Sequence, residues 1–338
     1  MSIQPLLELD RLSTHYVSAR GSRVVRAVEE VSLRVNSGET LGIVGESGSG
    51  KSTLALSILR LLPPAARIAG GKLLFEGENL LQKSDSEMRR VRGKRIAMIL
   101  QDPMASLNPL FTIGDQVAEP IRIHEGAGRA AAWSRACELL KAVRIPSPQE
   151  RLHQHPHEMS GGMRQRIVGA IGISCGPRLL IADEPTTSLD LTIQAQYLNL
   201  LRELQRAHGL ALIFITHNLG IVAKMCDQLA VMYAGRVVEL GPVKQLFSAP
   251  AHPYTKALLS SIPRINDNRG PLTAIDGQPP DLAALPPGCA FSPRCPRVFD
   301  RCREAPPPEL TFGDNRSVRC WLADRNTACD DPRTRGAI

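Results

Sequence analysis

Aromatic residues are scarce in this chain, where they make up only 4% of 338 residues. A formal net charge of +8 invites a nucleic-acid reading, but the 41 Lys and Arg residues are mixed with 33 Asp and Glu residues. The densest basic run, residues 88–95, has no interleaved aromatic side chain that could stack on a base. We therefore expect no nucleic-acid partner, and we read this run as a solvated surface that could lie near anionic lipid.

Long apolar runs are also lacking. No uninterrupted run approaches the ~20 residues that a membrane helix needs. The N-terminus does not combine a charged start with an apolar core, so it does not resemble a signal peptide. Both observations lead us to expect a cytoplasmic protein, in which the eight cysteines would not form structural disulfides. Hydrophobic residues make up 43% of the chain, which is ordinary for a globular protein with a core.

The order of the sequence patterns predicts an α/β fold. Residues 6–35 alternate apolar and polar side chains, as half-buried antiparallel strands do. Short apolar runs suited to strands buried on both faces occupy residues 41–44, 179–182 and 210–215. Helix signals punctuated by prolines dominate residues 104–158, which we interpret as an inserted helical subdomain. Residues 231–238 have the pattern of a hairpin.

A glycine-rich segment follows the first of these apolar runs. It fits the pattern G-x-x-x-x-G-K-[ST] and consists of Gly45, Glu46, Ser47, Gly48, Ser49, Gly50, Lys51, Ser52 and Thr53. The glycines let backbone N–H groups turn inward around phosphate oxygens, and the helix predicted from Ser52 adds its positive end. We expect Lys51 to contact the outer phosphates of a nucleotide and the Ser52 hydroxyl to bind Mg²⁺. A plain glycine-rich turn is the alternative.

Two carboxylates end the second apolar run. Asp183 can hold Mg²⁺ through water, and its neighbour Glu184 can accept a proton from an attacking water molecule. An acidic pair at a strand end could simply cap a turn. Because it follows a phosphate-binding loop in the chain, it predicts nucleotide hydrolysis.

A second glycine motif lies between these two elements. It consists of Ser160, Gly161 and Gly162, followed by Gln165. Many ATPases have a phosphate loop and an acidic strand end, but the Ser-Gly-Gly-x-x-Gln element between them resembles the signature of the ATP-binding-cassette (ABC) class.

The resemblance to the ABC class implies roles for further residues. Gln101 would reach Mg²⁺ and the attacking water, and His217 would contact the γ-phosphate. The segment Ser188-Leu189-Asp190 resembles the loop that runs along the dimer interface. Tyr16 is the candidate to stack on adenine, although a Tyr in an early strand is more often part of the core.

The resemblance also implies an architecture. The fold would be that of a P-loop NTPase of the ABC cassette type, with a RecA-like parallel sheet core, an N-terminal antiparallel β subdomain and the inserted helical subdomain at about residues 104–175. The cassette would occupy residues 6–250. Two subunits would join head to tail, with ATP between the phosphate loop of one and Ser160-Gly161-Gly162 of the other.

Several stretches resemble the dipeptide and oligopeptide permease branch of this class. They are residues 45–51, 101–109, 157–166, 182–187 and 252–259. The resemblance implies an ATPase subunit at the cytoplasmic face of a bacterial inner membrane. Its partners would be a second, non-identical homologous ATPase subunit, two transmembrane permease subunits and an extracytoplasmic substrate-binding protein. Imported substrates in that branch also include nickel, glutathione and some sugars.

The last expected segment, a C-terminal extension at residues 251–330, is rich in proline and carries four crowded cysteines. They are Cys289, Cys295, Cys302 and Cys320. No pair has the C-x-x-C spacing of a common zinc ribbon. Four cysteines on such loops could hold a [4Fe–4S] cluster or a zinc ion, or could remain reduced or disulfide-bonded thiols. The spacing resembles permease subunits with a [4Fe–4S] cluster, which we therefore predict. Cys329 could replace Cys320 as the fourth ligand.

The sequence patterns also bear on two other interpretations. A soluble ABC ATPase of DNA repair or translation would carry a long coiled coil inside the cassette or a second cassette, and neither pattern is present in this sequence. Alternatively, the C-terminal extension could be a redox module with the ATPase secondary to it. ATP hydrolysis itself needs no electrons, so a cluster there would be structural or redox-sensing.

Overall fold

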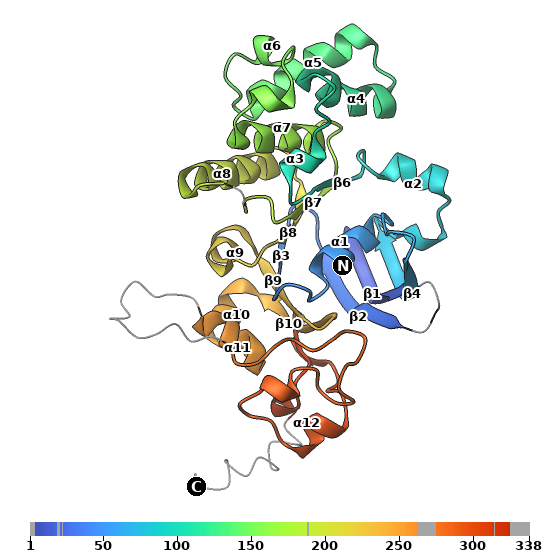
Figure 1. Ribbon diagram of the computed structural model, residues 1–338, viewed down its shortest axis with the longest axis vertical. Helices are drawn as coiled ribbons and strands as arrows, with labels where there is room; N and C mark the ends of the chain where they lie inside the picture. Colours follow the sequence, from blue (N-terminus) through green and yellow to red (C-terminus); the bar gives the residue numbers. More distant parts are fainter. Residues whose placement is uncertain are drawn as a thin grey trace. The chain divides into compact units, whose positions relative to one another are not determined.

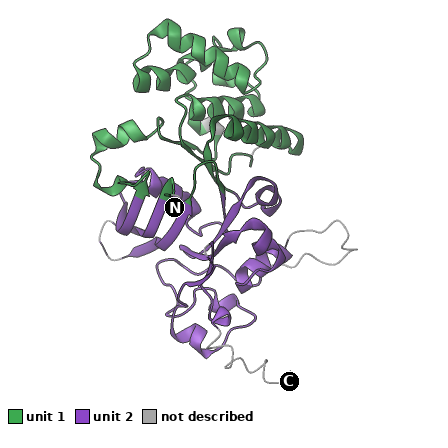
Figure 2. Ribbon diagram, turned by 180° about the vertical axis from the view of Figure 1, so that it is seen from behind, with its two compact units in different colours: residues 1–7, 35–40, 74–215 green, residues 8–34, 41–73, 216–338 purple. Residues whose placement is uncertain are grey.

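The computed structural model of the protein describes residues 4–18, 21, 23–187, 189–261, 275–313 and 315–324. The chain divides into two compact units, which Figure 2 shows in different colours. Unit 1 comprises residues 1–7, 35–40 and 74–215, and unit 2 comprises residues 8–34, 41–73 and 216–338. Each unit is therefore built from stretches that are far apart in the sequence.

Unit 1 combines parallel strands with a group of helices (Figure 1). Its parallel strands are β6 (Ile96–Ile99), β7 (Leu179–Asp183) and β8 (Ala211–Ile215), and the short antiparallel strand β5 (Glu78–Asn79) belongs to the other sheet. Its helices are α2 (Asp85–Val91), α3 (Pro103–Ser106), α4 (Ile113–Glu125), α5 (Arg129–Ala142), α6 (Pro148–Arg151), α7 (Gly161–Ile173) and α8 (Leu191–His208), with short 3₁₀ turns η1 (Leu80–Gln82) and η2 (Pro156–Glu158). Strands β6 and β8 each pair with β7 in parallel.

The apolar composition of β7 and β8 explains their position. Every residue of both strands is buried, as expected for parallel strands covered on both faces. Helix α7 packs on β6 and on the helices α3, α4 and α5. These helices fall within the range expected to form the helical subdomain. Helix α4 begins at the cap Thr112 and ends at Gly126, whose φ of 66° is the left-handed conformation that glycine adopts without cost.

Unit 2 contains strands from two sheets and the C-terminal segment (Figure 1). Its strands are β1 (Leu7–Val17), β2 (Val24–Val35), β3 (Thr40–Val44), β4 (Ala66–Phe75), β9 (Gln228–Tyr233), β10 (Arg236–Pro242), β11 (Leu310–Phe312) and β12 (Arg316–Val318). Its helices are α1 (Lys51–Ile58), α9 (Leu219–Met225), α10 (Val243–Ser248), α11 (Pro253–Ser260) and α12 (Asp300–Glu304), with 3₁₀ turns η3 (Ser292–Arg294) and η4 (Trp321–Ala323).

Two local predictions about strands are confirmed. The N–H of Leu6 donates to Val35 at one end of β1 and β2, and the N–H of Ser18 donates to Arg23 at the other, so the two strands run antiparallel. Strands β9 and β10 form the expected hairpin, in which Tyr233 pairs with Arg236. Its two loop residues, Ala234 and Gly235, have positive φ values of 49° and 80°, which a tight hairpin turn requires.

The core of unit 2 joins residues from both sides of position 250. Tyr254 of α11 and Phe291 pack with Val231 and Tyr233 of β9 in one buried cluster. The ring centroid of Tyr233 lies 4.6 Å from that of Tyr254 and 5.3 Å from that of Phe291. The C-terminal extension is therefore ordered partly by this shared core. Among the residues that the structure describes, no helix has both the length and the apolar composition that a membrane crossing requires.

Candidate nucleotide site and cysteine site

The phosphate-binding loop connects β3 to α1 within unit 2, as predicted. Its backbone needs glycine at two positions. A Cβ on Gly45 would lie 2.2 Å from the carbonyl oxygen of Met232, and one on Gly50 would lie 2.0 Å from that of Ala27. The Lys51 side chain is buried, and its Nζ donates to the carbonyl oxygens of Gly45 at 2.8 Å and Glu46 at 2.9 Å. The ammonium group is thus held against the loop that the sequence assigns to phosphate.

Two other candidate residues belong to unit 2. The hydroxyl of Tyr16 lies 3.4 Å from Oγ1 of Thr53, so the end of this side chain reaches α1 next to the phosphate loop. His217 is exposed and follows Thr216, whose N–H donates to the Ile43 carbonyl of β3. Asn218 then caps α9 by accepting from two backbone N–H groups. The chain turn that carries His217 is therefore fixed on both sides.

The candidate base lies in unit 1, directly after β7. Oε2 of Glu184 accepts hydrogen bonds from Nε2 of Gln101 at 3.2 Å and from Oγ1 of Thr187 at 3.0 Å. Glu184 has a φ of 46°, a left-handed conformation that costs a non-glycine residue of order 1 kcal/mol and often marks functional positions. Its neighbour Asp183 is 4% exposed. The structure thus brings Gln101 and Glu184 together, although they are far apart in the chain.

The signature segment forms the start of α7 in unit 1. Ser160 is the N-cap, and its Oγ accepts from the N–H of Met163 at 3.3 Å. Gly161 is exposed, with nothing within 4 Å of a built Cβ, whereas a Cβ on Gly162 would meet Ile193 of α8 at 2.8 Å. An exposed helix start with small residues leaves its N–H groups accessible to an anion.

The predicted interface loop is described only in part, because Ser188 lies outside the described residues. Asp190 is the N-cap of α8, and its Oδ1 accepts from the N–H groups of Thr192 and Ile193, both at 3.0 Å. Sequence reasoning missed this capping role, although Asp before an apolar helical stretch is a common N-cap signal.

The candidate nucleotide residues therefore form two sets. Unit 2 holds the phosphate loop, Tyr16 and His217, and unit 1 holds Gln101, the acidic pair at the end of β7, the signature segment and Asp190. Within each set the local geometry agrees with the expected roles. The roles themselves stay predictions.

The four cysteines of the C-terminal extension line one pocket in unit 2, together with Phe291 and Trp321. The backbone groups of Phe291, Arg297 and Leu322 act to lower the pKa of Cys289, Cys295 and Cys320, respectively, but burial outweighs them. Burial raises the pKa of Cys289 to about 11 and that of Cys320 to about 12. These thiols therefore stay protonated at neutral pH unless a bound metal cation stabilises the thiolate.

The donor set of this pocket agrees with thiolate ligation of an iron–sulfur group. Against this, no three His, Cys, Asp or Glu side chains within the described ranges are grouped so as to hold a metal ion. The prediction of bound metal therefore stays a prediction. Cys329 lies outside the described residues.

Comparison with known proteins agrees with the motifs. The family described as "ABC transporter" matches residues 28–187, and the family described as "Oligopeptide/dipeptide transporter, C-terminal region" matches residues 238–302. A dipeptide transport ATP-binding protein of Bacillus subtilis is 48% identical over 324 residues, covering 96% of each chain. An oligopeptide transport ATP-binding protein of Haemophilus influenzae is 45% identical, covering 95% of this chain and 98% of its own.

Solved structures give the same fold. The ATP-binding cassette MJ0796, described as dimeric and bound to ADP and phosphate, is 25% identical, with a TM-score of 0.63 over 70% of this chain and 98% of its own. A subunit of an ABC transporter complex from Clostridium perfringens is 26% identical, with a TM-score of 0.62 over 72% of this chain and 91% of its own. The predicted cassette fold is thus confirmed.

These observations define the class: the chain is an ABC nucleotide-binding protein. Within that class it belongs to the family of dipeptide and oligopeptide transport ATP-binding proteins. The resemblance found in its motifs is confirmed at both levels.

Proposed function

We propose that this chain is the ATP-hydrolysing subunit of an ABC importer for dipeptides or oligopeptides. The observation that carries the proposal is the pairing of Gln101 with Glu184 at the end of β7. A carboxylate fixed at this point, in a chain with a complete phosphate loop, is the arrangement that ATP hydrolysis requires. The family membership supports peptides as the imported substrate.

In the proposed reaction, Lys51 and the N–H groups of the phosphate loop bind the outer phosphates of ATP. Mg²⁺, held by Ser52 and Asp183 with help from Gln101, would neutralise phosphate charge when bound. The oxygen of the attacking water bonds to the γ-phosphorus, and Glu184 takes a proton from that water molecule. The bond to the β–γ bridging oxygen breaks, giving ADP and phosphate. The contacts from Gln101 and Thr187 orient the Glu184 carboxylate for this task.

The remaining roles follow from family membership. His217 contacts the γ-phosphate, and Tyr16 stacks on adenine. Ser160, Gly161 and Gly162 close over the nucleotide of a partner subunit, with Asp190 near the interface. ATP binding closes this dimer and hydrolysis reopens it. The partners are a homologous ATPase subunit, two transmembrane permease subunits and an extracytoplasmic binding protein, at the cytoplasmic face of a bacterial inner membrane.

The finer proposal concerns the cysteine pocket, where Cys289, Cys295, Cys302 and Cys320 would hold a [4Fe–4S] cluster. Its support is the pocket that all four cysteines line. The cluster would help to order a proline-rich segment. Zinc is the alternative ligand.

Glu184→Gln tests the reaction. The variant should bind MgATP with parent affinity but hydrolyse it about 100-fold or more slowly, because the water loses its base. Turnover at the parent rate would remove Glu184 from the mechanism.

Anaerobic purification with iron, sulfide and zinc analysis tests the cysteine pocket. About four iron and four sulfide per chain, lost in Cys295→Ser but kept in the control Cys175→Ser, would support the cluster. One zinc per chain would favour zinc, and a protein without metal would exclude both.

A further inference from the structure

An arginine of the C-terminal extension is bound to the phosphate loop. Nη1 of Arg294 donates to Oε2 of Glu46 at 2.7 Å, and Nη2 donates to Oε1 at 2.9 Å. This is a two-pronged pair, the strongest geometry for an arginine and a carboxylate. The Arg294 side chain is only 4% exposed and that of Glu46 is 25% exposed, so water screens the pair little. Glu46 is the second residue of the phosphate loop.

The backbone of Glu46 is also held from beyond residue 250. Its N–H donates to the hydroxyl oxygen of Tyr254 at 2.9 Å. The ring of Tyr254 packs on Tyr233 and Phe291, which fixes the hydroxyl in place. Both the side chain and the N–H of Glu46 are therefore bound by residues outside the cassette motifs.

Other contacts fix the guanidinium of Arg294 itself. Its Nε donates to the carbonyl oxygen of Asp276 at 2.9 Å, and Nη1 lies 3.3 Å from the hydroxyl of Tyr233. The guanidinium carbon lies 5.8 Å from the centre of the Tyr233 ring, within the range of a cation–π contact. The Glu46 carboxylate raises the pKa of Arg294 further above its usual range. Arg294 is thus a fixed positive charge at every accessible pH.

The location of Arg294 links it to the cysteines. It ends the 3₁₀ turn η3, and the next residue is Cys295, which lines the cysteine pocket. The turn begins three residues after Cys289. Whatever orders the loop between these two cysteines therefore also orders the arginine.

A carboxylate in a phosphate loop needs such a partner. An unpaired Glu46 would repel the phosphates, and its carbonyl oxygen is one of the two that accept from Nζ of Lys51. We propose that Arg294 is a positioning residue through which the C-terminal extension sets the affinity of the phosphate loop for MgATP. The proposal rests on the nucleotide-binding role proposed above for that loop.

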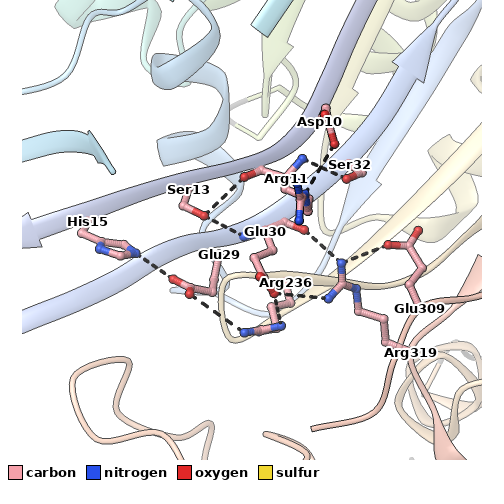
Figure 3. A network of polar contacts seen from close by, with 10 residues as sticks. All are labelled: Asp10, Arg11, Ser13, His15, Glu29, Glu30, Ser32, Arg236, Glu309 and Arg319. Carbon is pink, nitrogen blue, oxygen red and sulfur yellow. Dashed lines mark hydrogen bonds and ion pairs between the residues drawn. The ribbon is translucent and has the colours of Figure 1, made fainter. Parts of the chain in front are cut away.

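A second set of contacts between the extension and the N-terminal strands supplies the control (Figure 3). Nη2 of Arg319 donates to the backbone oxygen of Glu30 at 3.0 Å and to Oε2 of Glu309 at 2.9 Å. Arg319 is also well covered, at 13% side-chain exposure. Neither Glu30 nor Glu309 belongs to the phosphate loop, so Arg319→Gln weakens the attachment of the extension without uncovering Glu46.

The test measures equilibrium binding of MgATP to the full-length, anaerobically purified chain by calorimetry. Arg294→Gln should weaken binding about tenfold or more, because it leaves a partly buried carboxylate without its counter-ion beside the phosphates. Adding Glu46→Gln to this variant should recover most of the loss, because the repulsive charge is gone. Arg294→Lys, which keeps the charge but loses the two-pronged geometry, should give an intermediate affinity. Arg319→Gln should stay within about twofold of the parent.

Two results would overturn the proposal. One is parent affinity in Arg294→Gln, and the other is a loss that Glu46→Gln does not relieve, since a general folding defect of the extension would not depend on a charge in the loop. If Arg294→Gln does not fold, the MgATP affinities of Arg294→Lys and of the double variant Arg294→Gln/Glu46→Gln test the proposal instead. Parent affinity in Arg294→Lys, or a loss of affinity in the double variant as large as in Arg294→Lys, would then overturn it. Lys51→Ala distinguishes a failure of the proposed nucleotide site from a failure of the role proposed for Arg294. If Lys51→Ala binds MgATP like the parent, the nucleotide site itself is wrong, whatever the Arg294 variants show.

Discussion

Nε2 of Gln101 lies 3.2 Å from Oε2 of Glu184, so the amide donates to the carboxylate that we propose as the general base. Thr187 donates to the same oxygen. Two donors on one oxygen fix the orientation of the carboxylate. The Gln101 amide thus orients the carboxylate of Glu184, in addition to the Mg²⁺ contact proposed for it.

Gln101→Ala should therefore lower the rate of hydrolysis more than the affinity for MgATP. We expect a loss of about tenfold in kcat, because the carboxylate keeps one of its two donors but loses orientation. Steady-state ATPase assays and calorimetric binding would separate the effects. Thr187→Val removes the other donor and should act in the same direction. An affinity loss as large as the rate loss would assign Gln101 to binding alone.

Gly50 and Gly48 offer a matched pair in the phosphate loop. Both have positive φ, at 101° and 77°, but a Cβ on Gly50 would lie 2.0 Å from the Ala27 carbonyl oxygen, whereas one on Gly48 meets nothing within 4 Å. Gly48→Ala should cost about 1–2 kcal/mol of unfolding free energy through backbone strain. Gly50→Ala adds a steric clash and should cost more. Urea unfolding would measure both, and equal costs would contradict the clash.

A buried carboxylate anchors the start of the C-terminal extension. Glu239 is fully buried and accepts from the N–H groups of Ala251 and His252 and from the guanidinium of Arg316, at 2.8, 2.9 and 3.0 Å. Arg316→Gln should cost about 3–5 kcal/mol, because it leaves a buried charge without its counter-ion.

The exposed pair of Arg303 with Asp300 is the control for that prediction. Its side chains are 62% and 92% exposed. Arg303→Gln should change the unfolding free energy by less than about 1 kcal/mol, since solvent screens such pairs. Similar effects of the two variants in chemical unfolding would rule out a special role for Glu239.

His252 predicts a pH dependence of stability. Its ring is buried, Nδ1 accepts from the N–H of Tyr254 at 3.0 Å, and burial lowers the pKa of the side chain from 6.5 to about 3. Below pH 6.5 the unfolded chain binds a proton that the folded chain does not. The contribution of His252 to the free energy of unfolding is therefore fully present above pH 6.5 and is lost as the pH falls toward 3.

Between pH 7.5 and 5.5 this loss should be about 1.4 kcal/mol. His252→Asn keeps an acceptor for the Tyr254 N–H but cannot be protonated. Over the same pH range, the unfolding free energy of the variant should therefore fall by about 1.4 kcal/mol less than that of the parent. Identical pH profiles for the parent and the variant would contradict a neutral, buried His252.

The cassette motifs could be predicted from sequence because their chemistry is local. Consecutive residues form the phosphate loop, so its spacing identified it, and the consecutive Ser160-Gly161-Gly162 was identified by its resemblance to the ABC signature. The apolar runs gave β3, β7 and β8 nearly to the residue, because strands buried on both faces need continuous apolar side chains. The hairpin at residues 231–238 could be predicted because its two strands and its turn are adjacent in the sequence.

Contacts between distant residues could not be predicted in this way. Gln101 and Glu184 are 83 positions apart, and only the resemblance to a family placed them in one site. Asp190 was expected at an interface, and the structure shows in addition that it caps α8.

The sequence by itself determined the class of protein, its phosphate loop, its acidic strand end and the crowding of four cysteines near its end. Only the tertiary structure decided that Arg294 pairs with Glu46 across 248 positions and that Tyr254 binds the same residue. A carboxylate in the loop indicates the need for a positive partner, but 41 Lys and Arg residues could supply it. The choice among them is made by packing, because the shared core of Tyr233, Tyr254 and Phe291 fixes which arginine reaches the loop.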